Sequence, residues 1–158
     1  MNISCQLCDR KFKSIPGLYV HLARTHNFRG SRGRLSMKAI YNLFPLIRKR
    51  RWTRAEKFLR VVVKTNSEDE WIKGYVHALR GMITSLRVPY SPPQPYIIKL
   101  KKLDKNKLME AKKNFNELVN KLKRKSIFDS GYFQAWHDFA YYKLNFMPEQ
   151  TLKLNPSL

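Results

Sequence analysis

Acidic residues are scarce in this chain: 11 Asp and Glu stand against 32 Lys and Arg among 158 residues, which leaves a net charge of +21. A chain with this balance attracts polyanions. Hydrophobic residues still make up 43% of the sequence, enough to build a packed core, so the composition excludes a wholly disordered polyelectrolyte. Long hydrophobic runs are missing too. None approaches the roughly 20 residues that cross a bilayer, and we expect no membrane partner.

The sequence also lacks the usual signals for secretion and for catalysis. Met1 to Ser4 are not followed by the basic and apolar stretches of a secretory signal, so we expect an intracellular protein, in cytoplasm, nucleoid or nucleus. The sequence has no phosphate-binding glycine loop, nucleophile elbow, HExxH motif or dinucleotide glycine pattern. Asp138 follows His137, but neighbouring helical residues point in different directions, so we expect no catalytic dyad there. The sequence predicts no enzyme.

The positive charge is concentrated in two segments. Residues 28–60 hold eleven Lys and Arg and one acid, a net charge of +10, and residues 99–125 hold eleven and three, a net charge of +8. In the first segment Glu56 alone cannot neutralise so many cations by pairing along a helix. The second segment is explained equally well as a solvated, lysine-rich helix face.

The first segment joins an Arg-Gly stretch to a cationic cluster beside a tryptophan. A flexible Arg-Gly backbone can follow a phosphate backbone, guanidinium groups bind phosphate through two parallel hydrogen bonds, and an indole can stack on a base. A further cationic cluster closes the second segment. The residues predicted to contact nucleic acid are Arg29, Arg32, Arg34, Arg48, Lys49, Arg50, Arg51, Trp52, Arg54, Lys121, Lys123, Arg124 and Lys125.

Four candidate metal ligands near the start are spaced C-x2-C-x12-H-x4-H, namely Cys5, Cys8, His21 and His26. With Phe12 and Leu18 at the two core positions, residues 3–26 resemble the C2H2 zinc-finger family. The resemblance implies a small ββα fold around one structural Zn²⁺ ion, held by two thiolates and two imidazoles. Because both cysteines would then bind zinc, we expect a reducing compartment.

The same resemblance places the base-contacting positions of such a finger at Ser14, Gly17 and Val20. Glycine and valine carry no hydrogen-bonding side chain, and serine discriminates poorly among bases. A single finger also covers only about 3 base pairs. Sequence-specific control of transcription by this finger alone is therefore not expected.

The remainder of the chain has helical patterning, with apolar residues at helical spacing behind each start signal. The start signals are Ser36 before a short helix over 37–44 that ends or kinks before Pro45, the capping boxes Thr53-x-x-Glu56 and Ser67-x-x-Glu70, and the acids Asp104 and Asp129.

We interpret the helices as two copies of one unit. One constant shift of the sequence along itself, without a gap, superposes Phe58 on Phe115, Val62 on Val119, Trp71 on Phe128, and Gly74-Tyr75-x-x-Ala78 on Gly131-Tyr132-x-x-Ala135. A glycine inside a helix costs about 1 kcal/mol relative to alanine. The repeated glycine, with alanine four positions on, makes a small-residue face that another helix can approach closely.

The expected fold is therefore mainly α, with a small ββα zinc finger followed by a helical body of two duplicated α-hairpins. The predicted boundaries are a C2H2-type finger over 1–27, a basic Arg-Gly linker over 28–35, a basic helical segment with the first hairpin over 36–87, a Pro-rich linker over 88–98, the second hairpin over 99–146 and a tail over 147–158.

Three functions fit these observations. The favoured one is a zinc-containing protein that binds structured RNA in a ribonucleoprotein such as the ribosome, through phosphate contacts and shape. The first alternative is a DNA-binding regulator or chromatin-like protein. The second is an adaptor whose helical hairpins bind a protein partner, with the basic stretches serving solubility or localisation.

Overall fold

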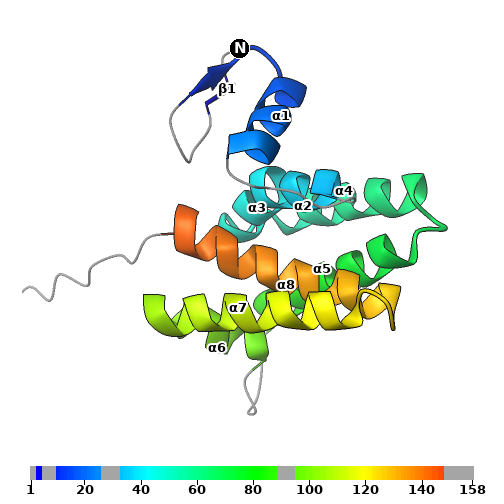
Figure 1. Cartoon of the computed structure of the whole chain (residues 1–158), viewed down its shortest axis with the longest axis vertical. Helices are drawn as coiled ribbons and strands as arrows, with labels where there is room; N and C mark the ends of the chain where they lie inside the picture. The colour runs from blue at the N-terminus through cyan, green and yellow to red at the C-terminus, as the bar shows by residue number, and fades with distance from the viewer. Residues whose placement is uncertain (1–2, 5–9, 26–32, 89–94, 148–158) are drawn as a thin grey trace, which may run out of the picture.

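The computed structural model describes residues 3–4, 10–25, 33–88 and 95–147, and this part of the chain is mainly helical, as the sequence predicts (Figure 1). In chain order the elements are β1 Ile3–Ser4, β2 Lys11–Phe12, α1 Ile15–Thr25, α2 Gly33–Lys38, the π-helical turn η1 Ala39–Leu43, α3 Phe44–Arg48, α4 Trp52–Thr65, α5 Glu70–Arg87, α6 Tyr96–Lys102, α7 Lys105–Leu122 and α8 Ile127–Phe146.

The first three elements form a small N-terminal module, β1, β2 and α1, at one end of the molecule (Figure 1). The two strands are antiparallel, with Ile3 opposite Phe12. Ser14 caps α1 as predicted, because its hydroxyl accepts a hydrogen bond of 3.3 Å from the Gly17 amide. Leu18 is 3% exposed, so the predicted core leucine is buried.

The chain then runs through α2, η1 and α3 as one helical stretch, which corrects the prediction of a short helix capped by Ser36. Ser36 lies inside α2 and is buried, because its hydroxyl has a partner elsewhere in the fold, the carboxylate of Asp138. Pro45 does not end the helix. It lies in the first turn of α3, where its missing N–H is tolerated, and the preceding turn has π geometry.

Helices α5 and α8 cross through two glycines. A Cβ atom at Gly74 would collide with the carbonyl oxygen of Phe128, and one at Gly131 would collide with the carbonyl oxygen of Trp71. The close approach predicted for these small residues is therefore confirmed. The contact is also reciprocal, because the sequence shift that superposes the first glycine on the second also superposes Trp71 on Phe128.

The hydrophobic core lies around this crossing. Helix α7 runs along α8, α4 packs with α3 and α5, and α6 covers part of α5 (Figure 1). The largest fully buried apolar side chains are Tyr75, Phe44, Ile40, Leu43, Leu59, Leu79, Met82, Ile97, Leu100 and Val76.

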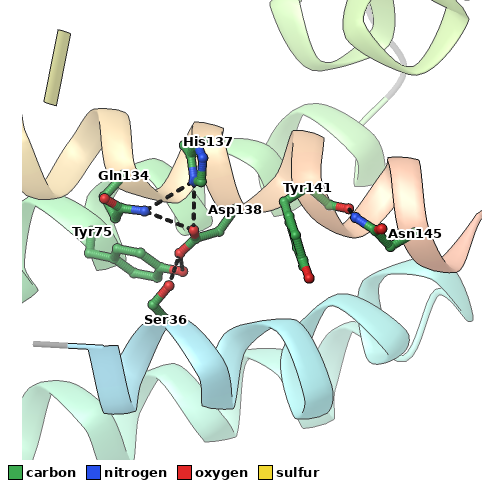
Figure 2. A network of polar contacts seen from close by, with 7 residues as sticks. All are labelled: Ser36, Tyr75, Gln134, His137, Asp138, Tyr141 and Asn145. Atoms are coloured by element: carbon green, nitrogen blue, oxygen red, sulfur yellow. Dashed lines mark hydrogen bonds and ion pairs between the residues drawn. The ribbon is translucent and has the colours of Figure 1, made fainter. Parts of the chain in front are cut away.

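A buried polar cluster ties α2, α5 and α8 together around Asp138, which is 2% exposed (Figure 2). Its Oδ2 accepts hydrogen bonds from the hydroxyls of Ser36 and Tyr75, the latter at 2.7 Å. Its Oδ1 accepts one from Gln134 Nε2 at 2.8 Å and lies 3.0 Å from Nδ1 of His137. The acceptor capacity of this buried carboxylate is thereby filled.

The predicted helix starts are partly wrong. Neither capping box forms: Arg51 precedes α4 with no side-chain cap, and Asp69 caps α5 by accepting from two amides of its first turn. Asp104 caps α7 as predicted, by accepting a hydrogen bond of 2.9 Å from the backbone amide of Lys107. Helix α8 is capped by Ser126 and not by Asp129. Packing fixes the backbone geometry at a helix start, and that geometry decides which nearby residue acts as the cap.

Helix α6 was not predicted, and it begins within residues assigned to the Pro-rich linker. Lys143 of α8 fixes its end by donating hydrogen bonds to the carbonyls of Leu103, at 2.8 Å, and Leu100, at 3.4 Å. Over the described ranges, no helix combines the length and apolar character that a membrane crossing requires.

Candidate nucleic-acid interface

The turn between α3 and α4 exposes four consecutive cations, Arg48, Lys49, Arg50 and Arg51. Arg50 has a φ of 54°, the left-handed conformation that glycine adopts most readily. Its amide bonds to the carbonyl of Ile47 at 3.1 Å, which closes the turn. The turn therefore holds an arginine where a glycine would fit with less strain.

Two members of this predicted cluster also contribute to the fold. Arg48 donates a hydrogen bond of 3.3 Å to the carbonyl of Phe146, at the carboxyl end of α8, where a cation interacts favourably with the helix dipole. Trp52, predicted to stack on a base, is half-buried and packs against the core. Arg54, in the first turn of α4, is exposed.

The second predicted cluster lies at the other end of α8. Lys121 is in the last turn of α7, and Lys123, Arg124 and Lys125 form the turn that leads into α8; all four side chains are exposed. Arg48 contacts Phe146, the last residue of α8, whereas Lys125 lies just before its first. A helix of this length rises about 30 Å, so the structure separates the predicted residues into two surfaces.

The Arg-Gly stretch falls largely outside the described residues: Arg29 and Arg32 lie there, and Arg34 lies in the first turn of α2. Since α2 begins at Gly33, the helical body starts earlier than the predicted linker allows.

Of the four predicted zinc ligands, His21 is described, and Cys5, Cys8 and His26 lie outside the described residues. His21 is 7% exposed, and its ring lies 4.7 Å from that of Phe12. Its Nδ1 is 3.1 Å from the hydroxyl of Thr25. Such a contact on one ring nitrogen orients the imidazoles of metal-binding histidines. Within the described ranges alone, no three His, Cys, Asp or Glu side chains converge to hold a metal.

A ββα zinc finger is not shown, because three of the four predicted ligands lie outside the described residues. Strands and helix follow in the order β1, β2, α1, and the one described candidate ligand is buried on the helix and turned against the core aromatic. Thiolate and imidazole are also the donors that Zn²⁺ prefers.

Sequence reasoning missed three exposed cations on α4: Lys57, Arg60 and Lys64. With Arg54 they recur at intervals of three and four positions, which is the signal that could have found them. It also missed the contact between His137 and Asp138. The imidazole Nδ1 lies 3.0 Å from the carboxylate, so the two side chains do not point apart as expected, while the absence of a catalytic dyad stays a prediction.

Asp138 nevertheless has the surroundings of a structural carboxylate, since both of its oxygens are occupied by side chains of three helices. Burial raises the pKa of its neighbour Tyr75 well above the usual value, and the negative charge of Asp138 adds to that rise.

No family model, curated protein or solved structure matches the chain. The resemblance of residues 3–26 to C2H2 zinc fingers therefore rests on the ligand spacing and the core positions alone.

Proposed function

We propose that the protein binds structured RNA through phosphate contacts, as a component of a ribonucleoprotein such as the ribosome. The observation that carries this proposal is the α3–α4 turn, where four exposed cations adjoin one another and Arg50 occupies a left-handed position. Backbone strain of this kind is retained where a side chain serves a function. The function proposed is binding, with no catalytic step.

The expected preference for RNA over DNA is supported by the first turns of α1. The Ser14 hydroxyl is engaged as the helix cap, Gly17 has no side chain, and Val20 is an exposed apolar residue. None of these positions provides the paired donors and acceptors with which proteins read bases in the major groove. Contact with phosphates and with the shape of a folded RNA needs no such groups.

The test is a titration of the purified, zinc-loaded chain against a fluorescent RNA stem–loop and a DNA duplex of equal length, over a series of salt concentrations. We expect tighter binding to the RNA and a log–log salt slope that reports several released counterions. Equal or tighter binding to the duplex would favour the DNA-binding alternative. A complete lack of binding to either at low salt would overturn the proposal in favour of a protein-interaction adaptor.

We also propose that the N-terminal module binds one structural Zn²⁺ ion through Cys5, Cys8, His21 and His26. The ion would hold the hairpin and the helix together, a function that so small a core cannot perform alone. Both cysteines would then be zinc thiolates, which fits an intracellular, reducing location.

Native mass spectrometry should find one zinc ion per chain, and Cys8→Ala should abolish it. Amide exchange should then show loss of protection in α1 while α5, α7 and α8 stay protected. Zinc-free protein with a fully protected α1 would refute the metal site.

Finally, we propose that the helical body consists of two copies of one α-hairpin. The sequence shift that superposes Gly74 on Gly131 also superposes the end of α4, at Thr65, on the end of α7, at Leu122. It likewise superposes the start of α5 on the start of α8, together with their caps, Asp69 and Ser126. The reciprocal glycine contacts between α5 and α8 support the same relation, because each copy presents its equivalent glycine to the other.

A further inference from the structure

We infer that the phosphate-binding surface is the exposed face of α4, built from Arg54, Lys57, Arg60 and Lys64 and continuous with the α3–α4 turn. This inference rests on the proposed binding of RNA and names where that binding occurs. Three of the four residues lie outside the clusters that the sequence singled out.

The geometry of α4 gathers these cations on one side. At 3.6 residues per turn, the four positions fall within an arc of about 120°. All four are exposed, whereas Ala55, Leu59 and Val62, on the opposite side of the helix, are buried in the core. From the first cation to the last, the row is about 15 Å long at 1.5 Å per residue.

The charge of this row is not offset by acids. Glu56 is the acidic residue of α4, and its carboxylate is held 2.8 Å from Arg87 of α5, where it neutralises another cation. Among the described residues, none of the four cations of the row takes part in an ion pair. They are therefore available to bind an external polyanion, and a row of cations releases counterions from several phosphates at once.

Helix α7 has five lysines against the four cations of α4, but a different arrangement. Asp104 lies 3.7 Å from Lys107, and Glu117 lies 3.9 Å from Lys113, with Glu110 between them in sequence. Exposed pairs of this kind contribute little to stability, but they reduce the positive potential along the helix. The comparison favours α4 over the lysine-rich second segment as the RNA-binding face.

The dimensions suit the outside of an RNA helix. The major groove of A-form RNA is too deep and narrow for side chains to read, so a basic helix contacts the phosphates that border a groove. Four long cationic side chains over about 15 Å can each reach a phosphate as α4 lies along the backbone.

The experiment compares two variants that lose the same charge. In the first, Arg54, Lys57, Arg60 and Lys64 are replaced by Gln. In the second, the exposed residues Lys101, Lys105, Lys107 and Lys113 of the lysine-rich second segment, none of them a predicted contact, are replaced by Gln. Glutamine is a good helix former, and the α4 positions are exposed, so circular dichroism should show unchanged helix content. Affinity for the fluorescent RNA stem–loop is then measured against salt for both variants and the unaltered chain.

We expect the α4 variant to lose at least about tenfold in affinity and to flatten the log–log salt slope by about 3, close to one per lost contact. The control variant should bind within about threefold of the unaltered chain. Equal losses in both variants, or a larger loss in the control, would overturn the inference while RNA binding itself stands. If the unaltered chain does not bind RNA, the proposed function fails instead.

A second measurement does not depend on variants. Amine acetylation of the chain, with and without the stem–loop, should show Lys57 and Lys64 protected by RNA and Lys113 of α7 unprotected. Protection of Lys113 without protection of the two α4 lysines would overturn the inference.

Discussion

Arg50 shows how one residue in this chain combines backbone strain with charge. Its left-handed φ of 54° costs a non-glycine residue about 1 to 2 kcal/mol, and its side chain projects from a turn with three other cations. A residue chosen for stability alone would be glycine or asparagine. The arginine is accounted for if its charge is needed at that place.

Arg50→Gly is therefore expected to raise the free energy of unfolding by about 0.5 to 1 kcal/mol, because relief of the strain exceeds the added entropy of the unfolded chain. The same change should weaken binding to the RNA stem–loop. Chemical denaturation and the RNA titration measure the two effects.

Lys49→Gly is the matched control, since it removes the same charge at a φ of −82°, where glycine relieves no strain. It should lower stability by about 0.5 to 1 kcal/mol. Equal destabilisation of both glycine variants would mean that Arg50 carries no strain of this size.

Tyr75 gives a prediction for alkaline pH. Its pKa is raised above the usual 10.0, first by burial and then by Asp138, so the folded state favours the neutral phenol. The stabilisation is fully present below pH 10 and is lost as the pH rises through the folded-state pKa. The free energy of unfolding should accordingly fall with pH above about 10.

In Tyr75→Phe this alkaline loss should be smaller. The variant should be less stable than the unaltered chain near neutral pH, because Asp138 loses a buried hydrogen bond worth about 1 to 3 kcal/mol. The gap between the two proteins should narrow as the pH rises above 10. A difference in unfolding free energy between the two proteins that stays constant above pH 10 would contradict the raised pKa of Tyr75.

At the scale of elements, the crossing of α5 and α8 depends on the absence of side chains at two positions. Gly74 and Gly131 each allow a backbone carbonyl of the other helix to approach where a methyl group would sit. Either substitution by alanine therefore forces the helices apart or distorts them, which costs about 1 to 3 kcal/mol or more.

Gly74→Ala and Gly131→Ala should lower the free energy of unfolding by similar amounts, of at least about 1 kcal/mol each. Gly81→Ala, on the same helix as Gly74, should raise it by about 0.5 to 1 kcal/mol, because nothing lies within 4 Å of the added methyl group and alanine favours the helix. Thermal unfolding followed by circular dichroism distinguishes these signs. A destabilised Gly81→Ala, or a neutral Gly131→Ala, would contradict the packing described.

The elements also show what sequence patterns can predict. Apolar residues at helical spacing, such as Leu79 and Phe115, predicted helices α5 and α7. The repeated glycine predicted the close crossing of α5 and α8. The caps of α4 and α5 were mispredicted, since several residues near each start can cap and tertiary packing selects one. Contacts of long sequence separation left no local pattern: Ser36 and Asp138 are 102 residues apart.

The candidate site, too, could be predicted from the sequence only in part. Runs of adjacent cations are obvious in a sequence, so Arg48 to Arg51 were found. The row on α4 interleaves its cations with apolar residues that face the core, and only the helix brings Lys57 and Lys64 onto one line.

At the scale of the whole molecule, a net charge of +21 on a folded chain repels itself. Unfolding moves the charges apart and so relieves the repulsion. Salt weakens the repulsion, because at moderate ionic strength charges more than about 10 Å apart are largely screened from one another. Stability and RNA affinity should therefore respond to salt in opposite directions.

We expect the thermal unfolding midpoint to rise as salt is added from low ionic strength, while affinity for the RNA stem–loop falls. The RNA itself should raise the midpoint, because it binds the folded state and lowers the repulsion among cations on the surface. Differential scanning calorimetry of the chain, with and without RNA, measures both effects on the midpoint. A midpoint that falls with added salt would show that attractive ion pairs, such as Arg87–Glu56, dominate over repulsion.

If the two hairpins are copies of one unit, as proposed above, the crossing of α5 and α8 has a consequence for the history of the chain. Each half offers its glycine and its carbonyl to the corresponding partner positions of the other, which is the self-complementary logic of an isologous dimer interface. An ancestor with a single hairpin could have used that surface to pair with a second copy of itself. Joining the copies in one polypeptide would make their association independent of concentration, and each half could then diverge, one acquiring the cationic row and the other the buried carboxylate.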